Sequence, residues 1–297
     1  MTSQTLLGAG PDLTTGTVQR SRRLRNALST GLIWASVVVA ASPLALVIVY
    51  VVRKGLAIVD LDFLTEDIPV LTQRPGPGMG PAVVGTLLTT GAASLMAIPL
   101  GVMAAVYLNE YGRRNRLASA IRFLSDVMAG VPSIVMGLFL YTVWVLRFGQ
   151  SGLAGALALG ALMLPIVIRS TESMLRLVPS DLREGSLALG ASTARTIVTV
   201  VLPAALPGIT SGALLAVARA AGETAPLLFT IGAARSVNVD LAEGANTALS
   251  VQIFRNAQLP FPGPQDRAWG AALTLIALVL ILTVIARLVS ARFAVRA

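Results

Sequence analysis

The chain contains six long apolar runs, and runs of this length limit its possible folds more than any other feature. A helix that crosses the hydrocarbon core of a bilayer needs about 20 mainly apolar residues. Charged residues make up only 12% of the 297 residues, whereas soluble domains carry about 25%. The sequence therefore predicts an all-α membrane protein whose six transmembrane helices cover roughly residues 28–52, 82–108, 120–146, 153–170, 207–232 and 268–287. Prolines inside these runs, among them Pro132 and Pro226, are expected to kink the helices without ending them.

Basic residues are unevenly divided between the segments that connect the runs. If the N-terminus is cytoplasmic, 14 arginines fall in the inside segments and seven basic residues in the outside segments. Cytoplasmic loops of membrane proteins carry an excess of Lys and Arg, so we expect both termini to be cytoplasmic. Residues 1–27 would form a polar cytoplasmic tail, and residues 28–290 a single transmembrane domain. Because the basic residues lie in short clusters between apolar runs, the net charge of +9 does not indicate a nucleic-acid partner.

The chain lacks two residue types that many catalytic and metal sites use. It has no cysteine and no histidine, which excludes a thiolate metal site and a Ser-His-Asp hydrolase. We predict neither a catalytic residue nor a metal site. The single lysine, Lys54, is not part of a G-x-x-x-x-G-K-[ST] phosphate loop. If nucleotide hydrolysis drives transport, ATP and magnesium must bind another chain, and no cofactor is expected on this one.

The segment between the fourth and fifth runs, residues 171–206, is the longest predicted inside loop. Ser180 can cap a first short helix, and Gly190 permits a sharp turn after it. A second short helix is expected from about Ser192 to Pro203. Two short helices at an angle would form a compact projection on the cytoplasmic face.

The loop contains a spaced set of residues, namely Glu184, Gly185, Ser186, Gly190, Val200, Leu202 and Pro203. This set resembles the cytoplasmic loop of binding-protein-dependent ABC importer permeases, which carries an E-A-A motif, then G, then I-x-L-P. In that family the loop forms a coupling helix that docks into a cleft of the ATPase subunit, so the resemblance implies contact with an ATPase. An amphipathic hairpin lying on lipid is the alternative. Two alanines are replaced by Gly and Ser, and the isoleucine by Val.

A second resemblance concerns the fifth run. Residues 218–230, A-R-A-A-G-E-T-A-P-L-L-F-T, are similar to the fifth-helix segment of phosphate-specific importers, and the A-P-L-L-F ending resembles their A-type permease subunit. Further matches occur along residues 80–290, such as V-P-S-I-V at 131–135 and L-P-I-V-I-R-S at 164–170. The resemblance implies the architecture of a type I ABC importer permease. It also implies a multi-pass protein of the bacterial inner membrane.

Two charges lie within the fifth run. Arg219 is 12 residues into it, which is near the middle of a core about 30 Å thick. An arginine at this depth costs about 2.5–3.5 kcal/mol on insertion scales, so it needs a compensating reason. Glu223 follows four residues later, on the same helix face. A guanidinium matches phosphate oxygens, so we expect the pair to line a translocation path. An ion pair that only neutralises itself is the alternative.

Three further polar residues lie near these charges or near the inner surface. Thr224 follows Glu223 directly and is included in the predicted path. Arg169 lies near the inner end of the fourth run, where it could line the path or extend to lipid headgroups. Asp126 is expected to pair with Arg122, four residues before it, in a structural role.

The resulting hypothesis is a permease subunit of an ATP-driven phosphate importer, with no catalytic activity of its own. Its expected partners are a homologous second permease subunit, an ATPase dimer, an extracytoplasmic phosphate-binding protein and the lipid bilayer. A permease for another small oxyanion or solute is the nearest alternative. A self-sufficient secondary transporter would show inverted repeats and discontinuous helices, and no repeat is visible. An intramembrane hydrolase would lack both a histidine and a Ser/Lys dyad.

Overall fold

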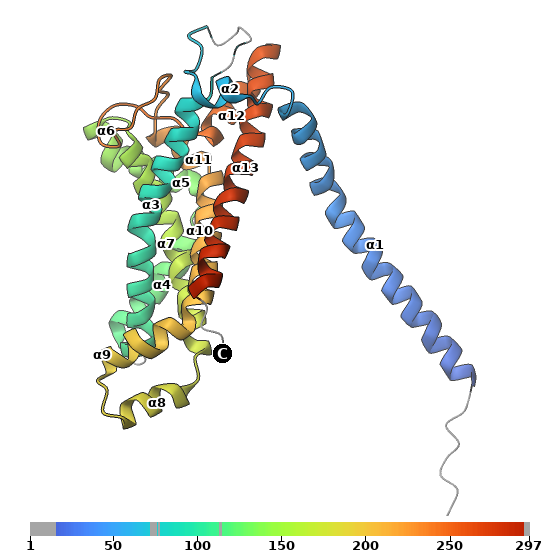
Figure 1. The fold of residues 1–297 in the computed structure, drawn as a ribbon, viewed down its shortest axis with the longest axis vertical. Helices are drawn as coiled ribbons and strands as arrows, with labels where there is room; N and C mark the ends of the chain where they lie inside the picture. Colours follow the sequence, from blue (N-terminus) through green and yellow to red (C-terminus); the bar gives the residue numbers. More distant parts are fainter. Residues whose placement is uncertain (1–15, 72–75, 77, 113–114, 294–297) are drawn as a thin grey trace, which may run out of the picture. The chain divides into compact units, whose positions relative to one another are not determined.

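The computed structural model describes residues 16–71, 76, 78–112 and 115–293, and all elements assigned within them are helices (Figure 1). The all-α prediction is confirmed for this part of the chain. The chain divides into two compact units, one ending at Tyr50 and the other beginning at Val51. Outside the described residues lie residues 1–15 of the predicted tail and four arginines of the charge count, Arg74, Arg113, Arg114 and Arg296.

The first unit comprises most of helix α1, Gly16–Gly55. Its apolar residues lie on all sides, and Trp34 and Leu46 are 66% and 70% exposed. A helix that is apolar all round is stable in a bilayer rather than in water. α1 contains the first predicted span and continues through Pro43 without a break.

Four helices of the second unit are long and apolar enough to cross a membrane. Two of them include a wider π-helical turn, one at the end of α3 and one before α10. Their bounds are α3 Gly80–Val106 with η1 Tyr107–Tyr111, α7 Gly152–Leu177, α9 Thr193–Thr196 with η3 Ile197–Val201 and α10 Leu202–Gly222, and α13 Pro262–Phe293. With α1, they make five candidate spans among the described residues.

The third predicted span, residues 120–146, is not one straight helix. Its first arm is α4, Arg116–Gly130, and its second arm begins with α5, Ser133–Leu140, at an angle of 104° to the first. Pro132 explains the break, because it lacks an N–H and disfavours the helical conformation at Val131. Val131 is accordingly extended, with a ψ of 127°. The expectation that this proline only kinks a helix is therefore wrong, and the two arms together form the sixth candidate span. The second arm continues as η2 Tyr141–Val145 and α6 Leu146–Phe148.

The fifth predicted span, residues 207–232, is also interrupted. α10 ends at Gly222, Glu223 is extended with a ψ of 129°, and the short helix α11, Ala225–Thr230, follows. In a continuous helix Pro226 could not donate to the carbonyl four residues earlier. It lies instead in the first turn of α11, where the missing N–H is tolerated. Pro226 begins a helix rather than kinking one.

The predicted inside loop, residues 171–206, is shorter than expected because helices extend into it from both sides. α7 continues to Leu177, and the second helix of the loop does not end near Pro203 but continues through η3 into α10. The wider turn of η3 immediately precedes Pro203, whose ring would clash with the carbonyl four residues earlier in a regular α-helix. Between α7 and α9 lies α8, Ser180–Ala188.

Two short helices complete the second unit, α2 at Leu61–Thr65 and α12 at Leu249–Ala257. Figure 1 places them at the end where α3 begins, while α8 and α9 lie at the opposite end. α12 buries several polar residues, among them Ser250 and Asn256, which are 3% and 2% exposed. A buried polar layer therefore lies at the end opposite α8.

The core of the second unit is built from α3, α7 and α10, which pack through small side chains. Ala93 and Ala97 of α3, Ala156 of α7 and Ala216 of α10 are at most 2% exposed and belong to one cluster. Small residues let the backbones of membrane helices approach closely, which increases van der Waals contact between them.

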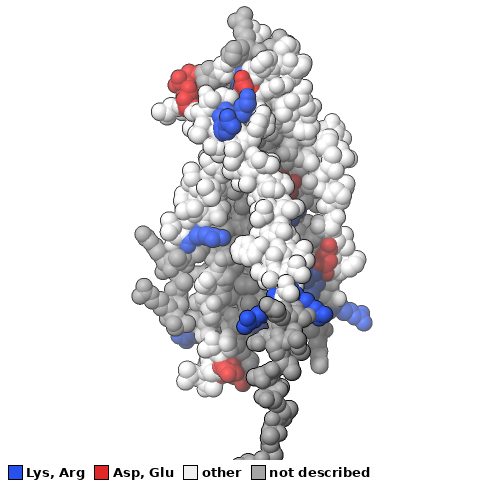
Figure 2. All heavy atoms as spheres, turned by 90° about the vertical axis from the view of Figure 1, so that its right-hand side faces the viewer, with Lys and Arg blue, Asp and Glu red and all other residues white. Residues whose placement is uncertain are grey.

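The surface of the protein is largely uncharged. On the face drawn in Figure 2, charged side chains form separate patches with large uncharged areas between them. Leu95 of α3 and Leu280 of α13 are 78% and 62% exposed. Large exposed apolar areas are rare on soluble monomers, and they are expected where lipid or another subunit covers the helices.

The close approach of α3 and the segment before α12 gives a test of this packing. A Cβ atom at Gly85 would collide with the carbonyl of Thr247, whereas one at Gly91 would meet no atom within 4 Å. We expect Gly85→Ala to lower the melting temperature of the purified protein, since overpacking costs about 1–3 kcal/mol. Gly91→Ala is the matched control in the same helix, and alanine is the better helix former. Equal melting temperatures would contradict the packing.

Candidate functional site

The two charges of the fifth span lie at the end of α10. Arg219 Nε is 3.6 Å from Glu223 Oε1, so the expected ion pair is present. Its geometry differs from the expectation, because Glu223 stands beyond the last helical residue. The side chain of Arg219 is 68% exposed and that of Glu223 is 20% exposed. A largely accessible guanidinium therefore lies on an otherwise apolar helix.

The interrupted backbone around Glu223 is held by α12. The Glu223 carbonyl accepts a hydrogen bond from Ser250 Oγ at 2.9 Å, and the Glu223 N–H donates to Ala220 at 3.1 Å. Thr224, the next residue, occupies the N-cap of α11 without a side-chain capping bond. Non-helical backbone at membrane depth is tolerated where protein surrounds it or where it lines a water-filled cavity. The break therefore brings the charged residues Arg219 and Glu223 and the hydroxyl residue Thr224 close together.

α7 lies beside this ion pair. Leu162 and Ile166 of α7 line a small cleft together with Arg219 and Glu223. Arg169 follows Ile166 by three residues, and residues three or four apart share a helix face. The structure therefore brings Arg169 to the same side of α7, one turn closer to the end that carries α8.

Arg169 forms an ion pair with Asp126 of α4. The expectation that Asp126 pairs with Arg122 is therefore wrong. The side chains of Arg169 and Asp126 are 45% and 56% exposed, and pairs this exposed contribute little to stability. Arg169 remains partly accessible to other groups.

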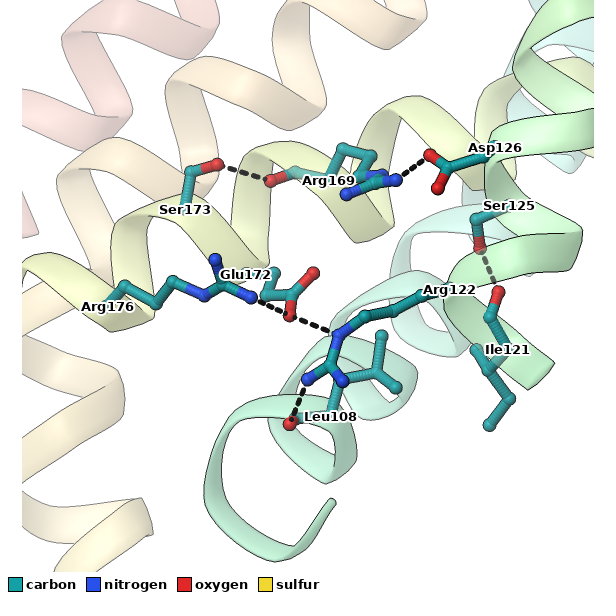
Figure 3. A network of polar contacts seen from close by, with 9 residues as sticks. All are labelled: Leu108, Ile121, Arg122, Ser125, Asp126, Arg169, Glu172, Ser173 and Arg176. Atoms are coloured by element: carbon teal, nitrogen blue, oxygen red, sulfur yellow. Dashed lines mark hydrogen bonds and ion pairs between the residues drawn. The ribbon is translucent and has the colours of Figure 1, made fainter. Parts of the chain in front are cut away.

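Arg122 instead contacts Glu172 of α7, as Figure 3 shows. Its Nε is 2.9 Å from Glu172 Oε1, and Arg176 Nη2 is 2.6 Å from the same oxygen. Arg122 Nη2 also donates to the carbonyl of Leu108 at 2.8 Å. The Glu172 side chain is only 4% exposed. A buried carboxylate needs a charged partner more than the exposed Asp126 does, which explains the orientation of Arg122.

Glu172 was not among the site residues predicted from the sequence. Its one local signal is the spacing of four residues to Arg176, which is typical of an ion pair on a helix. The contact with Arg122 spans 50 residues of sequence. It depends on the packing of α4 against α7, which no local pattern predicts.

α8 and the turn after it present the exposed part of the predicted coupling loop. Glu184 and Gly185 are exposed on α8, and Leu182 and Leu189 are 47% and 91% exposed. Gly190 has a φ of +84°, in the left-handed region that favours glycine, as the predicted turn requires. Exposed apolar side chains beside a charged residue are typical of a protein-protein interface.

The remaining motif residues lie deeper. Ser186 is half-buried, and its hydroxyl is 2.9 Å from that of Thr196. Leu202 and Pro203 are partly buried in the first turn of α10, where Leu202 packs against a cluster that contains Val201. These three motif residues therefore pack on the buried side of the loop and contribute little of its exposed surface.

The two helices of the loop begin at different caps. Ser192 Oγ accepts a hydrogen bond from the N–H of Arg195 at 3.3 Å, so the second helix begins as expected. Pro179, not Ser180, occupies the N-cap of α8, so the first cap lies one residue earlier than predicted. A proline disfavours helix at the residue before it, and Val178 is accordingly extended with a ψ of 124°. Pro179 thus ends α7 and lets α8 begin immediately afterwards.

Removal of the buried carboxylate should destabilise the inner end of the bundle. Glu172→Gln leaves the partly buried Arg122 without its anionic partner, and breaking a buried pair in this way costs about 3–5 kcal/mol. We expect a lower melting temperature of the purified protein. Asp126→Asn is the control, because an exposed pair contributes about 0–1 kcal/mol. If both variants have the melting temperature of the wild type, Glu172 does not stabilise the inner end of the bundle.

The chain is similar to known membrane transport proteins. Residues 97–295 match the family described as binding-protein-dependent transport system inner membrane component. The phosphate transport system permease protein PstA 1 of Mycobacterium tuberculosis (strain CDC 1551 / Oshkosh) is 45% identical over 262 residues, 87% of this chain and 86% of that protein. The phosphate transport system permease protein PstA of Yersinia pestis is 41% identical over 275 residues, 92% of each protein.

A solved structure with 13% sequence identity supports the fold. A chain of a bacterial alginate ABC transporter, in complex with an alginate pentasaccharide-bound periplasmic protein, aligns with a TM-score of 0.59 and covers 95% of this chain and 99% of that chain. The family match includes α8 and the break at Glu223. The predicted ABC importer permease architecture is confirmed, and the chain is a multi-pass protein of the bacterial inner membrane. It belongs to the family of binding-protein-dependent transport system inner membrane components.

Proposed function

We propose that this chain is a permease subunit of an ATP-driven importer of inorganic phosphate and forms half of its translocation path. The observation that carries the proposal is the similarity, along 87% of the chain, to a protein named as a phosphate transport system permease. The sequence contains no phosphate loop for a nucleotide, so ATP and magnesium would bind a separate ATPase subunit. This chain would perform no catalytic step.

The charges on α10 and α7 suit the passage of an anion. A guanidinium offers a planar set of donors that matches phosphate oxygens. Arg219 would bind phosphate first, with Thr224 beside it, and Arg169 would follow one turn further along α7. Glu223 and Asp126 pair with these arginines, which would weaken anion binding. Conduction requires binding that is weak enough to permit release.

The exposed surface of α8 would bind the ATPase subunit through Glu184, Gly185 and the leucines beside them. A homologous second permease would complete the path, and an extracytoplasmic phosphate-binding protein would deliver the anion. Closure of the ATPases on nucleotide would displace α8 in both permeases and alternate the access of the path. The family description supports a binding-protein-dependent system.

One structural feature also fits the secondary-transporter alternative. Helices are discontinuous at Pro132 and at Glu223 among the described residues, and such breaks occur at the binding sites of secondary transporters. The alternatives differ in their energy source. ATP dependence of uptake therefore separates them.

The orientation of the chain can be tested by chemical labelling, because the sequence has no cysteine. Leu189 directly follows α8 and Val239 lies between α11 and α12, and they are 91% and 71% exposed. Figure 1 shows α8 and α12 at opposite ends of the second unit. With both termini cytoplasmic, a membrane-impermeant maleimide should label Val239→Cys in intact cells. Leu189→Cys should react only after permeabilisation. The reverse pattern would overturn the orientation.

Uptake of radiolabelled phosphate into proteoliposomes tests the proposed function. The complete complex should import phosphate only with ATP and binding protein, and omission of this chain should abolish import. Unlabelled arsenate and sulfate as competitors would show whether another oxyanion is preferred. ATP-independent uptake, or none at all with the complete complex, would contradict the proposal.

Two arginine variants in the same assay test the path. Arg219→Ala should abolish uptake without preventing assembly, and Arg219→Lys should retain part of it, since it keeps the charge but loses the planar donors. Leu215→Ala, one turn earlier on α10 and 66% exposed in the wild type, controls for simple truncation. Wild-type uptake by Arg219→Ala would remove this residue from the path.

A further inference from the structure

We propose that Arg183 is a positioning residue that fastens the coupling helix α8 to the inner ends of α3 and α7, so that a displacement of α8 moves these spans. The inference rests on the proposed function, in which an ATPase subunit binds α8. It assigns the mechanical connection to one partly buried side chain outside the recognised loop motif.

Arg183 differs from its neighbours on α8 in its burial. Its side chain is 15% exposed, while Leu182 is 47% exposed and Glu184 is also exposed. A long charged side chain is seldom buried unless it is paired. The guanidinium of Arg183 therefore points into the protein while most of the other side chains of α8 are exposed.

The guanidinium joins α8 to the end of α7. Arg183 Nη1 donates to the carbonyl of Val178 at 2.6 Å, and Nη2 donates to the carbonyl of Leu175 at 2.8 Å. The last carbonyls of a helix have no partner within it. Arg183 supplies donors to the last turn of α7 and the residue after it, so α8 cannot separate from α7 without exposing these groups.

The same side chain joins α8 to α3. Arg183 Nη2 is 3.1 Å from Glu110 Oε1, and the Glu110 side chain is 8% exposed. Glu110 also accepts a hydrogen bond from Asn109 Nδ2 at 2.6 Å. Both residues belong to η1, the π-helical turn that ends α3, and π-turns inside helices are frequent at functional sites. Arg183 thus links three elements across 73 residues of sequence.

A second contact holds the other side of α8. The hydroxyls of Ser186 and Thr196 are 2.9 Å apart, and Thr196, which is 3% exposed, directly precedes η3 and α10. α8 is therefore connected to α3 and α7 through Arg183 and to α10 through Ser186. These three spans form the core of the unit and carry Arg169 and Arg219, so the connection leads from the ATPase surface to the proposed path.

The test measures phosphate imported per ATP hydrolysed by the complete complex in proteoliposomes. Arg183→Gln removes the charge and most of the donors, and Glu110→Gln removes only the ionic contact with η1. Each variant should keep binding-protein-stimulated ATP hydrolysis but lower the ratio by about fivefold or more, the lower end of coupling between distant sites. The double variant should be no worse than Arg183→Gln alone. Arg116→Gln, an exposed charge at the first residue of α4, is the control and should leave the ratio unchanged.

The outcomes separate this inference from the proposed function. A wild-type complex that imports no phosphate would overturn the proposed function itself. If the wild type imports phosphate and both variants keep its ratio, Arg183 does not transmit the displacement. Loss of hydrolysis and import in equal proportion in both variants would show a purely structural role and would also overturn the inference. If Arg183→Gln fails to assemble, Glu110→Gln alone decides between these results.

Discussion

Hydrocarbon offers no hydrogen-bond partner, so the polar groups inside the spans depend on partners within the protein, and the fold depends on this requirement. An unsatisfied polar group in the membrane costs several kcal/mol. Hydroxyl groups inside the spans meet the requirement locally: Thr86, Thr89 and Ser125 donate to carbonyls four residues earlier in the same helix. At the inner end charged groups also pair between helices, Arg122 of α4 with Glu172 of α7 and Arg169 of α7 with Asp126 of α4.

The two helix breaks follow from the same requirement. Prolines 132 and 226 remove a helical donor each, and the chain responds by ending one helix and beginning another. The helices after the breaks, α5 and α11, pack against each other, and a Cβ atom at Gly137 would lie 2.6 Å from Pro226 Cα. The backbones of these two helices therefore approach closely at Gly137 and Pro226. The second break also places Glu223 where its carbonyl reaches α12 and its carboxylate reaches Arg219.

α7 connects the features that bear on function. It carries Arg169 on the face near the α10 charges, Glu172 in the buried network of Figure 3, and the terminal carbonyls that Arg183 contacts. Small residues let it pack closely against α3 and α10. A change at the α8 surface can therefore reach the charges of the proposed path through a densely packed helix, without a flexible connection between them.

Much of the architecture could be predicted from the sequence, because it depends on local quantities. The length and hydropathy of the apolar runs predict the spans. Gly190 predicts a turn, because glycine readily adopts a positive φ. The spacing of four residues predicts the Arg219–Glu223 pair. The resemblance of residues 184–203 and 218–230 to known motifs indicated the family. Each of these signals lies within about one turn or one helix of sequence, where local geometry is nearly fixed.

Only the tertiary structure decided which distant groups meet. Asp126 pairs with Arg169 and not with Arg122, because the buried Glu172 competes for Arg122 more strongly. The same holds for Arg183, whose contact with Glu110 depends on α8 folding back against the end of α3. Whether a proline kinks a helix or ends it also depends on its neighbours, since packing must satisfy the freed carbonyls. Hydropathy indicates the depth at which a residue lies in the membrane. Its partner depends on the relative energies of the possible contacts between helices, and only the folded structure brings those helices together.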